Sequence, residues 1–90
     1  MKNFILNKIE ETKKVLENIE LTENLVTFYK GKVKVFEDVL EGIDNPNLES
    51  IVEIANALVK VELDYGMNDM FLLKGKLEAF DEVLGFMKKD

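Results

Sequence analysis

The sequence lacks five residue types on which much protein chemistry depends: cysteine, histidine, arginine, tryptophan and glutamine. Without cysteine and histidine there is no disulfide, thiol nucleophile, imidazole base or ordinary zinc-ligand set. Without arginine there is no guanidinium clamp for phosphate or guanine. Most classes of enzyme and most proteins that read nucleic-acid sequence are therefore excluded.

Long hydrophobic runs are also missing. No segment approaches the roughly 18 uninterrupted apolar residues that span a bilayer. The N-terminal apolar run, Phe4–Leu6, stops at Asn7 and is too short for the core of a secretory signal. We therefore expect no contact with a membrane and a cytoplasmic location in a bacterial host cell.

The residues that are present describe one small acidic domain. The chain has 90 residues, of which 47% are hydrophobic and 33% charged, enough for a single core and too apolar for disorder. Acidic residues outnumber lysines by 18 to 12, for a net charge of -6. This negative field, with no arginine, disfavours direct binding of nucleic acid.

Apolar residues recur at helical spacing along the whole chain, and no useful length alternates with the period of two that strands require. The fold class predicted is all-α. The single proline, Pro46, divides the chain into two halves. The spacing predicts helices over about 3–19, 23–41, 46–65 and 69–88.

Residues at the predicted helix ends agree with these ranges. Thr22, Asn45 and Asn68 are suitable N-caps, because their side-chain oxygens accept hydrogen bonds from first-turn amides. Pro46 fits the first position of the third helix. Gly66 fits the left-handed residue that ends that helix.

The two halves resemble each other. Segment 30–40 aligns with 74–84, so that Gly31 matches Gly75 and Phe36 matches Phe80. We interpret 1–90 as one helical domain with an internal repeat, 1–45 and 46–90, each copy a helical hairpin. Two stacked hairpins predict a pseudo-two-fold four-helix bundle. Chance similarity between amphipathic helices is the alternative.

The matched Lys-Gly-Lys segments are the first candidate site. Glycine inside a helix costs about 1 kcal/mol relative to alanine, and here it recurs at matched positions. One interpretation is close approach of another backbone, an anionic ligand or an acidic patch of a partner; the other is a tolerated glycine on an exposed face. The residues concerned are Lys30, Gly31, Lys32, Lys74, Gly75 and Lys76.

The third predicted helix is the second candidate. Its Ile51, Ile54, Leu58, Val61 and Tyr65 form one apolar stripe, which we expect to face the core. Further apolar residues lie off that stripe. We expect this surplus to form an oligomer interface, with internal packing as the alternative; the candidates are Val52, Val59 and Leu63.

Catalytic, metal and cofactor sites are not expected. Carboxylate bundles that hold two metals use a Glu-x-x-His pattern, and this chain has no histidine. The only serine, Ser50, has no base nearby, because Lys60 lies almost three turns further along the same predicted helix.

Lysine, asparagine, isoleucine and phenylalanine, which AT-rich codons encode, are plentiful. The whole chain is similar in composition to small acidic proteins of phages and mobile elements from AT-rich bacteria, including anti-CRISPR and other anti-defence proteins. That resemblance implies an oligomeric, non-enzymatic inhibitor that binds and blocks a bacterial defence macromolecule. One alternative is an oligomeric sponge that sequesters an anionic signalling nucleotide through the repeated lysines. Another is a structural or assembly protein.

Overall fold

The computed structural model describes residues 1–67 and 69–89, and these residues form four α-helices and no strand. The all-α prediction is confirmed. The helices are α1 (Lys2–Leu16), α2 (Glu23–Glu41), α3 (Leu48–Asp64) and α4 (Met70–Met87).

The first helix ends earlier than its apolar spacing predicts. The side chain of Asn18 accepts a hydrogen bond from the Glu20 amide at 3.0 Å, and this local turn replaces the last predicted helical turn. Ile19, the last residue of the predicted helix, is 97% exposed as a result.

Two predicted helix ends are confirmed. The Thr22 hydroxyl accepts a hydrogen bond from the Leu25 amide at 3.2 Å and caps α2. Gly66 has a φ of 62°, in the left-handed region that glycine adopts without strain.

The predicted start of the third helix is wrong by two residues. Asn45 accepts a hydrogen bond from the Asn47 amide at 2.8 Å, which makes a turn before the helix, and α3 begins only at Leu48. Pro46 therefore lies outside the helix. The predicted cap Asn68 lies outside the described residues, and the Asp69 side chain caps α4.

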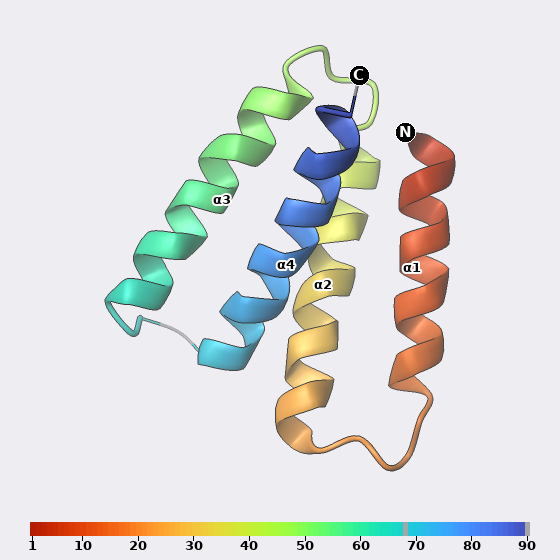
Figure 1. Ribbon diagram of the computed structural model, residues 1–90, viewed down its shortest axis with the longest axis vertical. Helices are drawn as coiled ribbons and strands as arrows, with labels where there is room; N and C mark the ends of the chain where they lie inside the picture. The colour runs from red at the N-terminus through yellow and green to blue at the C-terminus, as the bar shows by residue number, and fades with distance from the viewer. Residues whose placement is uncertain (68, 90) are drawn as a thin grey trace.

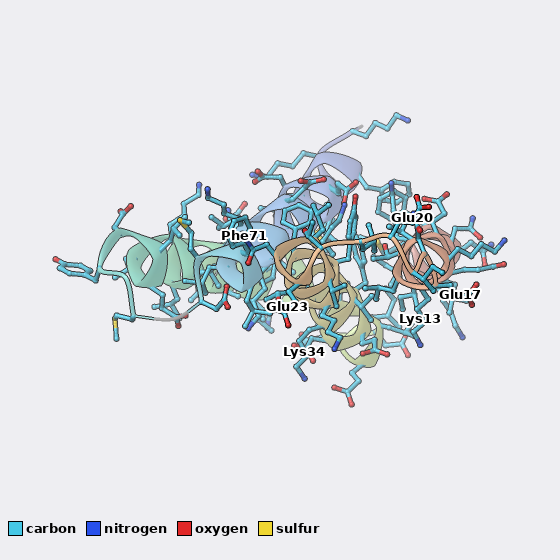
Figure 2. All side chains as sticks on the ribbon, turned by 90° about the horizontal axis from the view of Figure 1, so that it is seen from below. Lys13, Glu17, Glu20, Glu23, Lys34 and Phe71 are labelled. Carbon is cyan, nitrogen blue, oxygen red and sulfur yellow. The ribbon has the colours of Figure 1, made fainter. Side chains whose placement is uncertain are left out.

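The helices lie side by side in the order α1, α2, α4, α3. In Figure 1, α2 and α4 run in the same direction at the centre, and Figure 2 shows α1 and α3 on opposite sides of this pair. The molecule is thin, at 38 × 31 × 21 Å. The most extensive contacts are those of α2 with α4, α1 with α2 and α3 with α4.

The hydrophobic core follows from this order. Most of its side chains come from the central helices, with Val35, Phe36 and Val39 from α2 and Leu73 and Val83 from α4. The outer helices each contribute one buried face. Their other faces are left without a covering helix.

Candidate interaction surfaces

The two Lys-Gly-Lys segments lie where α2 crosses α4. Gly31 and Gly75 are both buried at this crossing. A Cβ atom on Gly31 would lie 2.5 Å from the carbonyl oxygen of Leu72, and one on Gly75 would overlap the carbonyl group of Phe28. Only glycine permits helix backbones to come so close. The interpretation of these glycines as exposed is wrong: each is covered by the other central helix.

Within each segment, the two lysines leave the helix on different sides, because residues two apart do not share a helix face. Lys30 and Lys74 are exposed, and the Lys74 Nζ lies 5.8 Å from the centre of the Phe71 ring. Lys76 is partly buried. Only Lys32 is buried, and its surroundings differ from those of the other three.

Lys32 belongs to a cluster of charges that joins three helices. Its Nζ lies 3.0 Å from Oε1 of Glu78 and 3.1 Å from Oε2 of Glu82, both on α4, and its side chain is only 10% exposed. Lys8 of α1 lies 3.4 Å from the other carboxylate oxygen of Glu82. Glu82 is therefore shared between two lysines.

These contacts raise the pKa of Lys32. Burial is the largest single influence and by itself would lower the pKa, because it penalises the charged form. The hydrogen bonds and negative charges of Glu78 and Glu82 together outweigh it, so that the pKa lies above the ordinary value of 10.5. Lys32 is thus a charged group held inside the fold by two carboxylates.

Each groove beside these lysines also contains carboxylates, so that neither groove has an excess of positive charge to bind an anion. Lys30 lines a groove of about 480 Å³ that also holds the carboxylates of Glu23 and Asp69. Lys32 lines a separate groove of about 130 Å³, in which Glu11 and Glu82 offset Lys8 and Lys32. The geometry on which the nucleotide sponge depends, lysines that converge on one pocket, is not present in these two grooves.

The three residues expected to form an oligomer interface face inward. Val52 is 2% and Val59 8% exposed, and both belong to the hydrophobic core; Leu63 is partly buried against it. The prediction that they are surplus surface is therefore wrong. The physical reason is the rotation of α3 about its axis, which turns this face toward α4.

The stripe expected to face the core lies on the surface instead. Ile54 is 61% and Leu58 59% exposed, and the other three residues of the stripe are also exposed. It consists of Ile51, Ile54, Leu58, Val61 and Tyr65, and we call it the α3 stripe. Sequence reasoning recognised the stripe but assigned it to the wrong side, because both faces of this helix are apolar.

Several other site classes have no representative in the described part of the chain. No group of three or more acidic side chains within it is arranged to hold a metal ion. No helix in residues 1–67 and 69–89 is long and apolar enough to cross a membrane. Ser50 is exposed in the first turn of α3.

Comparisons with protein-family models, with curated proteins and with solved structures find no match to this chain. The chain's own geometry is therefore the basis for assigning roles to its residues. Two features stand out in that geometry: the glycine crossing, which is internal, and the α3 stripe, which is open to solvent.

Proposed function

We propose that this chain is a non-enzymatic interaction protein that binds another protein chain through the α3 stripe. The observation that carries the proposal is the exposure of these five apolar side chains in one row, four of them on the outer helix α3 and the fifth, Tyr65, directly after its last residue. Single exposed apolar residues are ordinary on protein surfaces, but a continuous row of them is typical of a protein-binding face.

The charges on α3 favour a protein over a membrane as the binding partner. Helices that lie on anionic membranes carry lysine and arginine opposite their apolar face. Here α3 has one lysine, Lys60, and four acidic residues, Glu49, Glu53, Glu62 and Asp64. An anionic lipid surface or a nucleic-acid backbone would be repelled by this helix.

A photo-crosslinking experiment tests the proposal. A photoreactive phenylalanine analogue is placed at Leu58, in the middle of the stripe, and the protein is irradiated in the bacterial cells that express it. We expect one or a few adducts of discrete mass. The matched control carries the analogue at Lys34, an exposed position on α2 (Figure 2), and we expect no discrete adduct there.

A second substitution makes the test specific. Ile54→Glu in the chain labelled at Leu58 places a charge one turn away on the same stripe, and we expect the adducts to disappear. If the Leu58 and Lys34 positions gave the same adducts, or if neither gave any, the α3 stripe would not be a protein-binding face and the proposal would be overturned.

The narrower form of the proposal is a phage or mobile-element inhibitor that blocks a bacterial defence macromolecule, with an assembly role as the alternative. Its support is the acidic composition and the abundance of residues from AT-rich codons. In strains that carry single defined defence systems, we expect the wild-type chain to restore phage plating and Leu58→Glu to fail. No restored plating in any such strain would count against an inhibitor.

The tandem, pseudo-two-fold arrangement of the two hairpins is part of the same proposal. Gly31 approaches the carbonyl group of Leu72, and Gly75 that of Phe28. In the repeat alignment Gly31 matches Gly75 and Phe28 matches Leu72. Replacing each residue by its match therefore converts one of these contacts into the other. This reciprocity supports a duplication of one hairpin followed by pairing of α2 with α4 along a common direction.

A further inference from the structure

We propose that the α3 stripe binds a second copy of this chain, with the two α3 helices antiparallel, so that the protein is a symmetric homodimer. This inference rests on the proposed protein-binding role of the stripe and names its occupant. Four observations carry it: the spacing of the stripe, its chemical character, the charges beside it and its area.

The spacing of the stripe is that of a helix that pairs with another helix. Its positions alternate between steps of three and four residues, from Ile51 through Ile54, Leu58 and Val61 to Tyr65. This is the a/d pattern of a two-helix seam, in which side chains of one helix fit between those of the other. The remaining exposed apolar residues lie on other helices, as Leu6 and Leu25 do, or between helices, as Ile19 and Met67 do, and they form no such row.

The chemical character of the face favours a copy of the same chain over an unrelated protein. Contacts between unrelated proteins draw much of their affinity from tryptophan, tyrosine and arginine, whereas homodimer interfaces are more uniformly apolar. Four of the five stripe residues are aliphatic. Small residues flank the stripe from the first turn to the middle of α3, Ser50 and Ala57 on one side and Ala55 on the other, and would let a second helix come close.

The charges beside the stripe select the antiparallel orientation. The flanks are neutral in the first half of α3 and acidic in the second, where Glu62 and Asp64 lie. A parallel pair would gather four carboxylates at one end. An antiparallel pair places each acidic end beside the neutral flanks and the positive N-terminal end of the other α3.

The area of the stripe is sufficient for a weak, specific dimer. The five side chains leave on the order of 500 Å² of apolar surface uncovered on each copy. An interface that covered all five side chains on both copies would remove about 1,000 Å² from water, the lower limit for a specific interface. We expect a dissociation constant of about 1–100 μM, because interfaces of this size bind weakly.

The pairing has a definite register. With the symmetry axis midway between Ile54 and Leu58, Ile54 of one copy contacts Leu58 of the other, and Ile51 contacts Val61. Ala57 then lies close to its own counterpart across the axis. Ser50 and its counterpart lie about 18 Å apart along the helices, from a rise of 1.5 Å per residue.

Sedimentation velocity over a concentration series tests the dimer, with the purified full chain. We expect the wild type to shift from monomer to dimer mass as concentration rises. Leu58→Glu should raise the dissociation constant at least about 100-fold, because it buries a charge at the centre of the seam. Leu25→Glu is the matched control, since Leu25 is also an exposed leucine and lies on α2, away from the stripe, and it should leave the constant unchanged. Circular dichroism confirms that each variant is folded.

Cysteine crosslinking tests the orientation, in a chain that has no cysteine of its own. Under mild oxidation we expect Ala57→Cys to form a covalent dimer and Ser50→Cys to form far less. Equal yields from the two positions would indicate a parallel pair and overturn the antiparallel geometry.

The remaining outcomes separate this inference from the proposed function. A wild type that stays monomeric at all concentrations, or a dimer that Leu58→Glu leaves intact, overturns the dimer. If the photo-crosslinker at Leu58 then still captures a different protein of discrete mass, the proposed protein-binding function stands without the dimer. If it captures nothing, both fail.

Discussion

Gly31 of α2 lies against the carbonyl oxygen of Leu72 in α4, so close that a Cβ atom on the glycine would come within 2.5 Å of that oxygen. Gly75 and Phe28 repeat this contact from the opposite helix. The central pair of helices is thus packed backbone to backbone. The outer helices are positioned by this pair, because α1 packs on α2 and α3 on α4.

Gly75→Ala is expected to destabilise the protein by roughly 1–3 kcal/mol, the usual cost of overpacking a tight core. The new methyl group would meet backbone, which cannot turn aside as a side chain can, so α2 and α4 would have to separate. Urea unfolding followed by circular dichroism measures the loss. Gly85→Ala is the matched control on the same helix: nothing lies within 4 Å of its Cβ position. There we expect a gain of up to about 1 kcal/mol from helix propensity, and an equal gain at Gly75 would contradict the close crossing.

Lys32→Met is expected to destabilise the fold by about 1–2 kcal/mol at neutral pH, because it removes the positive charge that offsets the negative charges of Glu78 and the partly buried Glu82. The free energy of unfolding from urea titration is the measurement. Lys13→Met removes an exposed pair with Glu37 and serves as the control, with a change within about 0.5 kcal/mol. Equal effects at the two positions would show that the buried cluster has no special role.

The contribution of Lys32 should disappear in alkaline solution. A lysine whose pKa is raised by folding stabilises the protein below its unfolded value near 10.5, and this contribution is lost as the pH rises through the folded-state pKa. The difference in free energy of unfolding between wild type and Lys32→Met should therefore stay constant from about pH 7 to 10 and shrink above 10.5. A difference that persisted undiminished at pH 12 would contradict the raised pKa.

Two neighbouring residues test which face of α3 is buried. Val59→Ala should lower the free energy of unfolding by about 1–2 kcal/mol, because Val59 belongs to the core against α4. Leu58→Ala, at a low concentration where the chain is monomeric, should change it by less than about 0.5 kcal/mol. The reverse order would mean that the stripe, and not the Val52 face, contacts α4.

We expect Asn56 to make the fold less stable than an apolar residue at the same position would. It is buried on α3, and its side-chain oxygen has no hydrogen-bond partner among the described residues. Asn56→Leu should raise the free energy of unfolding by about 1 kcal/mol, because an unsatisfied buried polar atom is removed. Asn56→Asp, which buries a charge, should lower it, and thermal unfolding of both variants measures the difference. A loss of stability in Asn56→Leu would indicate that the amide serves the packing of α3 on α4.

Local sequence determined the helices and their approximate ends. Helical periodicity depends only on residues three and four apart, so it can be recognised without knowing any partner helix. The same is true of the Thr22 cap and of the left-handed Gly66, whose conformations are set by groups within a few residues. The repeat, visible as matched Lys-Gly-Lys segments, also indicated that Gly31 and Gly75 occupy comparable places.

The tertiary structure decided which surface of each helix is covered. Because α3 is apolar over more than half its circumference, its own sequence is compatible with burial of either Val52 and Val59 or of Ile54 and Leu58. Contact with α4 on one side alone leaves the second pair in solvent. Likewise, Lys32 is buried and Lys30 is exposed because α4 lies on one side of α2. The helical periodicity of α2 shows which residues share a face, but it does not show which face a neighbouring helix will cover.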